Sequence, residues 1–168
     1  MSVEEPREAS RWPTVYVETS VISYLAARPS GDPLTRTRQL ATQRWWANRS
    51  RWNLVVSSAM MIEAMQGDHD YVVRRLEFLE DVPAVQVTAP VRALARELLV
   101  RGPLPPSARV DAEHIALAAV NGFDYLVTWN LKHIANPAIQ GRVADICVSA
   151  GYEPPLIRTP DVLLAEAT

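Results

Sequence analysis

The chain has 168 residues, a formal net charge of −2, 48% hydrophobic residues and 21% charged residues. This composition is typical of a globular protein. It contains no run near the roughly 18 apolar residues of a membrane span, and it argues against holding nucleic acid by bulk charge alone. Cys147 is the only cysteine, so no internal disulfide can form and we expect a reducing, cytoplasmic location. The acidic, polar start predicts a flexible tail over residues 1–12, followed by a single domain over residues 13–168.

Short β-rich runs alternate with longer helical patterns along the chain. In chain order, strands are predicted at residues 14–17, 53–57, 84–88, 125–128 and 155–158. Helices are predicted at residues 20–27, 34–50, 59–66, 70–81, 89–101, 110–120 and 159–167. Strands that are nearly continuously apolar are covered on both faces, as in parallel sheets. We therefore predict an α/β fold, a three-layer α/β/α sandwich with a mostly parallel central sheet of four to five strands.

Four polar residues stand where strands and helices meet. Glu18 directly follows the first predicted strand, and Glu63 lies one turn into the helix after the second. Asp111 opens the helix that precedes the fourth strand, and Asn130 comes just after that strand. In open parallel sheets, sites form in the crevice beyond the carboxyl ends of the strands. We therefore expect these four side chains to meet at one edge of the sheet.

Three converging carboxylates repel one another unless a cation lies between them. Mg²⁺ or Mn²⁺ prefers oxygen ligands, and no Cys/His cluster with zinc spacing competes for the role. Glu18, Glu63 and Asp111 are therefore the predicted metal ligands. Simpler interpretations exist for three of the four residues. Asp111 is an acid of the kind favoured at a helix N-terminus, and Glu63 is compatible with a solvated helix face. Asn130 is equally well explained as a turn residue.

Three motifs resemble one known family. They are "VYVETSVISYL", "VVSSAMMIEAMQG" and "VDAEHIALAAVNGFDYLVTWNLKHIAN", with a further match at "TPDVLL" near the C-terminus. Together they resemble the PIN-domain ribonucleases, in particular the toxins of VapBC-type toxin–antitoxin pairs. The resemblance spans residues 14 to 165. It implies a PIN-like sandwich that cleaves RNA with an Mg²⁺- or Mn²⁺-bound acidic cluster, with catalytic residues Glu18, Glu63, Asp111 and Asn130.

Supporting residues are expected around the acids, some from the resemblance and some from their positions in the chain. Thr19 and Ser20 lie beside the first acid, where they orient it or a water, and His114 shares a helix face with Asp111 as an orienting residue. Arg109 and Lys132 flank the predicted edge, either as RNA contacts or as ordinary surface charge. The partners implied are an RNA substrate, a cognate antitoxin protein and a second copy in a homodimer. His133, in a loop, is assigned no role.

One departure from the family concerns the first acid, which is Glu18 here and ordinarily aspartate. The extra methylene moves the carboxylate by about 1.5 Å, and catalytic constellations tolerate roughly 0.5 Å. The alternative hypothesis is therefore a PIN-fold module that binds RNA or protein with weakened catalysis. A small-molecule phosphotransferase is a third class, disfavoured because no second aspartate follows the first strand and no phosphate-binding glycine loop is present.

Residues 36–51, most of which belong to the predicted helix 34–50, contain a cluster of five arginines that the motifs do not explain. We interpret it as a solvated face in preference to a specific contact surface, and interpret Trp129 as a lid over the sheet edge. The basic residues of this cluster are Arg36, Arg38, Arg44, Arg49 and Arg51.

Overall fold

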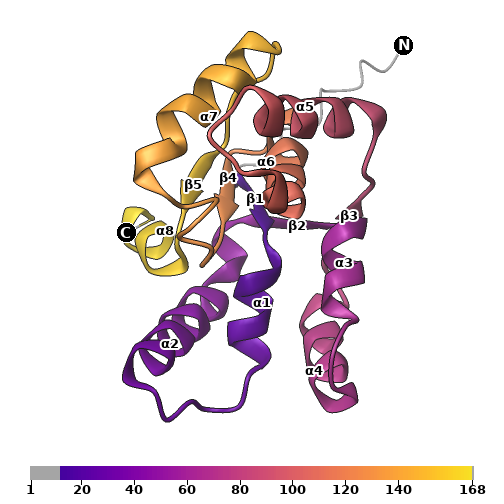
Figure 1. The fold of residues 1–168 in the computed structure, drawn as a ribbon. Coiled ribbons are helices and arrows are strands. Elements are labelled where there is room, and N and C mark those ends of the chain that lie inside the picture. The colour runs from indigo at the N-terminus through magenta and orange to yellow at the C-terminus, as the bar shows by residue number, and fades with distance from the viewer. Residues whose placement is uncertain (1–11, 168) are drawn as a thin grey trace, which may run out of the picture.

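The structure is a computed structural model that describes residues 12–167. Five strands and eight α-helices are found in this part of the chain, together with two short 3-10 turns (Figure 1). The strands are β1 (Thr14–Val17), β2 (Asn53–Ser57), β3 (Ala84–Val85), β4 (Tyr125–Val127) and β5 (Leu156–Arg158). The helices are α1 (Thr19–Ala26), α2 (Pro33–Ala47), α3 (Ser58–Ala64), α4 (His69–Leu79), α5 (Ala89–Val100), α6 (Arg109–Val120), α7 (Pro137–Ser149) and α8 (Pro160–Glu166), with turns η1 (Arg49–Arg51) and η2 (Pro106–Ala108).

The strands form one parallel sheet in the order β3-β2-β1-β4-β5. The chain runs outward from β1 to β3, then crosses back to β4 and continues outward to β5. The direction therefore reverses between β1 and β4, which is the position where open α/β sheets place their ligands. Val17 pairs with Val127 there, so the residues that follow these two strands lie side by side.

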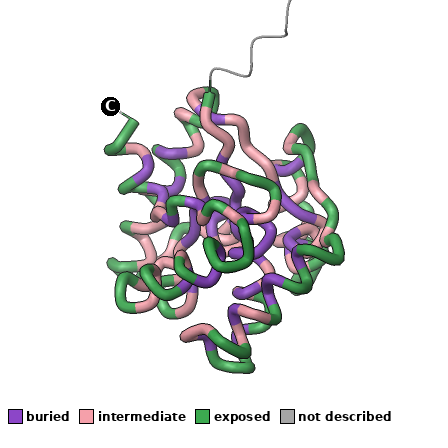
Figure 2. The backbone as a smooth tube through the Cα atoms, turned by 90° about the horizontal axis from the view of Figure 1, so that it is seen from above, coloured by how far each residue is buried: buried purple, intermediate pink, exposed green. Residues whose placement is uncertain are grey.

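Two hydrophobic clusters cover the two faces of the sheet. Val15 and Val17 pack on one face with residues of α1, α2, α3 and α8, whereas Tyr16 packs on the other with residues of α5, α6 and α7. This alternation follows from the two-residue period of a strand. Figure 2 shows buried segments through the middle of the molecule and exposed segments around it. The predicted three-layer α/β/α sandwich with a parallel sheet is confirmed.

Most predicted elements are found within a few residues of their expected bounds, with two differences. The third strand is only Ala84–Val85, because its pairing with β2 ends at Val85 and Thr88 is already the N-cap of α5. Helix α7 was not predicted, although its start carries clear signals: the Asn136 side chain accepts from the Ala138 N–H at 3.0 Å, and a proline follows at the first helical position.

The predicted tail, residues 1–12, lies outside the described residues except for Trp12. The division into a tail and a single domain, residues 13–168, stays a prediction. No helix within residues 12–167 has the length and apolar character needed to span a membrane.

Candidate active site at the carboxyl edge of the sheet

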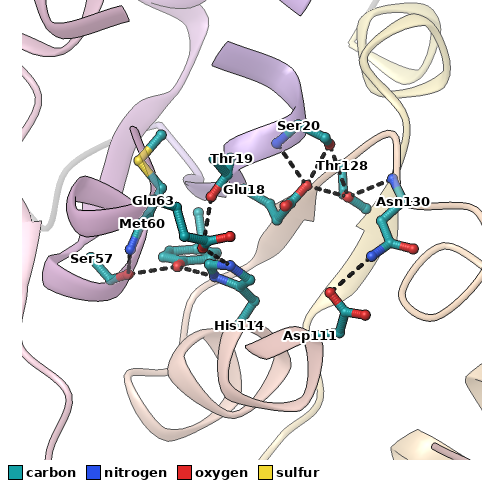
Figure 3. A network of polar contacts seen from close by, with 11 residues as sticks. Glu18, Thr19, Ser20, Ser57, Met60, Glu63, Asp111, His114, Thr128 and Asn130 are labelled. Atoms are coloured by element: carbon teal, nitrogen blue, oxygen red, sulfur yellow. Dashed lines mark hydrogen bonds and ion pairs between the residues drawn. The ribbon is translucent and has the colours of Figure 1, made fainter. Parts of the chain in front are cut away.

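Glu18 lies at the point where β1 gives way to α1. Its backbone N–H donates to the Val127 carbonyl at 3.1 Å, which extends the β1–β4 pairing by one residue. Its side chain caps α1: Oε2 accepts from the Ser20 N–H at 3.1 Å and from the Ser20 hydroxyl. The same oxygen accepts from the Thr128 hydroxyl at 2.7 Å (Figure 3). The residue is 6% exposed.

Glu63 reaches the same region from α3. Its Oε1 accepts from the Thr19 hydroxyl at 2.9 Å and from His114 Nε2 at 2.7 Å. The His114 side chain is 1% exposed and that of Glu63 33%, so the acid opens to solvent while its partner does not. Because a carboxylate only accepts hydrogen bonds, Nε2 of His114 carries the proton.

The other nitrogen of His114 faces the interior. Nδ1 lies 2.6 Å from the Tyr16 hydroxyl, which in turn lies 2.8 Å from the Ser57 hydroxyl. The Ser57 hydroxyl also accepts from the Met60 N–H at 3.0 Å and so caps α3, the helix that carries Glu63. Tyr16 donates to Nδ1 when the ring is neutral, and Nδ1 donates to the Tyr16 hydroxyl when the ring is charged. In either state this hydrogen bond fixes the ring orientation of His114.

Asp111 enters from the first turn of α6. Its Oδ1 accepts from Asn130 Nδ2 at 2.9 Å and its Oδ2 from His133 Nδ1 at 2.8 Å. The loop is held in turn, because the His133 N–H donates to Asn130 Oδ1 at 3.0 Å and the Asn130 N–H donates to Thr128 Oγ1 at 2.9 Å. Thr128 therefore connects the Glu18 and Asp111 parts of the network.

The three acids (Glu18, Glu63 and Asp111) act together on the ionisation of His114. Burial lowers the pKa of this imidazole, but the hydrogen bond to Glu63 and the charges of all three acids outweigh it and raise the pKa above 6.5. Burial raises the pKa of Glu63, whereas the hydrogen bond and charge of His114 and the Thr19 hydroxyl bring it below 4.5 overall. Both shifts favour the charged form of the pair. Burial also raises the pKa of Tyr16, so its hydroxyl stays protonated.

The structure brings most predicted site residues into this one network: Glu18, Thr19, Ser20, Glu63, Asp111, His114 and Asn130. Figure 3 shows the three acids turned toward one region below the start of α1. Arg109 and Lys132 do not join the network. Both are exposed, Arg109 at the start of α6 and Lys132 in the loop between Asn130 and His133.

The donor set has the chemistry of a site for a hard cation, since it consists of oxygen atoms. Glu18 Oε1 and Glu63 Oε2 receive no hydrogen bond from residues 12–167, whereas both oxygens of Asp111 do. Within these residues, no group of three or more His, Cys, Asp or Glu side chains lies in a position to hold a metal ion by itself. The arrangement fits an ion held by one or two carboxylates and waters, the usual manner for Mg²⁺.

Sequence reasoning missed four members of the network: Tyr16, Ser57, Thr128 and His133. Thr128 was detectable, because pairing of the first and fourth strands places the residue after each side by side. Tyr16 and Ser57 lie in apolar strands, where the sequence predicts that they are ordinary core residues. The loop position of His133 predicts no role in the sequence, yet its ring contacts Asp111.

No protein-family model and no curated protein sequence matches the chain. Solved structures are similar to it, and two of them are described here. The first is VapC20 of Mycobacterium tuberculosis, a sarcin-ricin loop cleaving toxin: TM-score 0.52, 26% identity, 67% of this chain and 86% of that chain covered. The second is VapBC2 from Rickettsia felis bound to a DNA fragment from their promoter, with TM-score 0.51, 14% identity, and 87% of this chain and 98% of that chain covered. The second likeness shows the fold alone. The resemblance found in the motifs is thereby confirmed at the level of the fold: the chain has a PIN-like fold similar to that of the VapC toxin VapC20.

Proposed function

We propose that the chain is an Mg²⁺- or Mn²⁺-dependent endoribonuclease and the toxin of a toxin–antitoxin pair. The observation that carries the proposal is the position of Glu18. It is a buried carboxylate with no ion pair within residues 12–167, at the point where the sheet reverses direction, joined by hydrogen-bonded neighbours to two further acids. Burying a carboxylate without a cation is costly, and a bound divalent ion removes that cost.

The three acids (Glu18, Glu63 and Asp111) would hold the ion, directly or through water. When bound there, such an ion would activate a water as nucleophile and would offset the charge that develops on the phosphodiester. In the cleavage step the water oxygen bonds to phosphorus as the bond from phosphorus to the 3′ oxygen breaks. The 3′ oxygen takes up a proton, which leaves a 5′-phosphate and a 3′-hydroxyl.

The remaining residues would hold the acids in place. Thr19 and His114 fix Glu63, and Ser20 and Thr128 fix Glu18. Asn130 fixes Asp111 and belongs to the catalytic set in our proposal. Residues that orient ligands in this manner are worth about 10- to 100-fold in metal affinity or activity.

Substrate and partners follow by analogy. VapC20 is a sarcin-ricin loop cleaving toxin, which supports RNA as the substrate here. The likeness to VapBC2 supports a cognate antitoxin protein as partner. A homodimer and a cytoplasmic location belong to the same proposal. Arg109 and Lys132 would contact RNA phosphates beside the acids, because both are exposed cations next to Asp111 and Asn130 in the chain.

The length of Glu18 suits its surroundings. Its Oε2 caps α1 and also reaches the Thr128 hydroxyl on the neighbouring chain segment. An aspartate would end about 1.5 Å short of this position. We therefore expect Glu18→Asp to lower activity, whereas the attenuated-module alternative expects it to raise activity.

A ribonuclease assay with added Mn²⁺ or Mg²⁺ tests the proposal on the wild type, Glu18→Asp and Asp111→Asn. We expect cation-dependent cleavage by the wild type and a loss of about 100-fold or more in Asp111→Asn. Asp145→Asn is the matched control, because this acid is exposed on α7, and it should cleave as the wild type does. Equal activity of Asp111→Asn and wild type, or a silent wild type that Glu18→Asp revives, would refute the proposal as stated.

A further inference from the structure

An ordered arginine lies beside the candidate active site. The Arg38 guanidinium lies over the Trp129 ring, 5.5 Å from its centroid, and its Nη1 donates to the Tyr24 hydroxyl at 3.3 Å. The Trp129 indole donates to the Thr42 hydroxyl at 2.8 Å, and that hydroxyl donates to the Arg38 carbonyl at 2.7 Å. We call these four residues the Arg38 cluster. The contacts hold Arg38 at two places: Trp129 and Tyr24 contact its guanidinium, and Thr42 contacts its backbone carbonyl.

The Arg38 cluster is attached to the acids by short connections. Trp129 stands between Thr128 and Asn130, and its backbone N–H donates to the Ser20 hydroxyl at 2.8 Å. That hydroxyl in turn donates to Glu18. Tyr24 lies one turn after Ser20 on α1, so both occupy the same helix face. The cluster therefore forms the α1–α2 side of the acidic site.

The charge of Arg38 is not neutralised by an acid in this part of the molecule. Within residues 12–167 the arginine ion pairs are Arg101–Glu97 and Arg158–Glu166, and no carboxylate lies within ion-pair distance of Arg38. The pKa of Asp32 is lowered mainly by the hydrogen bond from the Thr35 backbone N–H. The charge of Arg38 is the smallest of the causes. A guanidinium has five N–H donors, and Tyr24 takes one of them.

We propose that Arg38 binds a backbone phosphate of the RNA next to the bond that is cut. The proposal rests on the proposed function and deepens it by naming a substrate contact that the motifs do not contain. A polyanion that approaches three carboxylates needs a cation on the rim, and a planar guanidinium binds phosphate bidentately. Trp129 and Tyr24 hold the arginine in advance, so binding orders fewer side-chain torsions. Trp129 supports the arginine and does not stack a base.

RNA binding by variants that do not cleave tests this proposal. Asp111→Asn protein is titrated into a fluorescent single-stranded RNA oligonucleotide in Mg²⁺, and anisotropy gives Kd at several salt concentrations. Adding Arg38→Gln should weaken binding about tenfold and reduce the slope of log K against log salt by about 0.7, the value for one phosphate contact on a single strand. Arg38→Lys should fall between the two, since it keeps the charge without the planar fork.

Arg44→Gln is the matched control, because this arginine lies exposed on the same helix and its removal changes the net charge equally. It should leave Kd within twofold and the slope unchanged. The inference is overturned if Arg38→Gln binds like Arg44→Gln, or if the Asp111→Asn protein binds no RNA. The two proposals can fail separately. If the wild type cleaves no RNA but Arg38→Gln weakens RNA binding, the nuclease proposal is refuted and the phosphate contact of Arg38 is retained.

Discussion

The site contains the same acid–imidazole pair twice, in two different surroundings. His114 bonds Glu63 at 2.7 Å with the imidazole 1% exposed, whereas His133 bonds Asp111 at 2.8 Å with both side chains about a fifth exposed. Behind His114 lie Tyr16 and Ser57, in the core. His133 instead belongs to a loop, where its backbone N–H donates to Asn130. Two contacts of similar length therefore have unequal consequences. Breaking the buried one leaves uncompensated polar groups, whereas water can replace the partly exposed one.

The largest effect is expected for His114→Ala. It removes a fully buried ring and leaves the Tyr16 hydroxyl and Glu63 without their partner, so the free energy of unfolding should fall by about 3 kcal/mol. Urea denaturation of the metal-free protein measures it. His69→Ala, which removes an exposed histidine at the start of α4, is the control and should change stability by less than about 0.5 kcal/mol. Equal losses in the two variants would contradict the comparison.

The next effect is expected for Tyr16→Phe, which keeps the ring and removes only the hydroxyl. Ser57 and Nδ1 of His114 then lose a buried partner, which should cost about 1–2 kcal/mol in unfolding free energy. Because His114 then orients Glu63 less firmly, cleavage should also fall by about tenfold. The control is Tyr125→Phe, since Tyr125 is half-buried and its hydroxyl makes no hydrogen bond within residues 12–167. A Tyr16→Phe protein with wild-type kcat would show that this chain of contacts is structural only.

The buried pair also predicts how stability depends on pH in the metal-free protein. The pKa of His114 is raised, so its contribution is complete below about 6.5, the unfolded value, and is lost as pH rises through the folded value. The pKa of Glu63 is lowered, so its contribution is complete above about 4.5 and is lost as pH falls through the folded value. Unfolding free energy should therefore be highest between these limits. The maximum should flatten in His114→Gln, and an unchanged curve would count against the pair.

The smallest effect is expected for His133→Ala. Its imidazole is partly exposed, so water replaces the lost contact and the free energy of unfolding should change by less than about 1 kcal/mol. Activity should still fall by about tenfold, because Asp111 loses one of the two groups that orient it. Thermal unfolding and cleavage assays on the same preparation separate the two quantities. A stability loss as large as that of His114→Ala would remove the distinction between the pairs.

The sequence was sufficient for the fold because the strands are short, apolar and separated by patterned helices. Its failures have local causes. The third strand stops at Val85, where an edge strand gives way to the start of α5, and hydrophobicity alone does not mark that end. The sequence pattern does not predict α7, although Asn136 and Pro137 mark its start, because the apolar residues of this helix are widely spaced among small and polar ones.

For the site, the sequence predicted which acids would converge, since the order of elements fixes which strand ends meet. It did not predict their hydrogen-bond partners. Tyr16 is indistinguishable from a core residue until His114 is placed against it, and His133 contacts Asp111 only because the loop turns back through Asn130. Such contacts depend on side-chain directions in three dimensions, which spacing along the chain does not encode.

The most direct test is calorimetric titration of Mn²⁺ into the wild type, Glu18→Gln and Asp145→Asn. Glutamine keeps the length and shape of Glu18 and removes its charge. The wild type and Asp145→Asn should bind the ion alike, and Glu18→Gln should bind it at least about tenfold more weakly. A wild type that binds no Mn²⁺, or a Glu18→Gln protein that binds it equally well, would contradict the claim that these carboxylates meet in order to hold a cation.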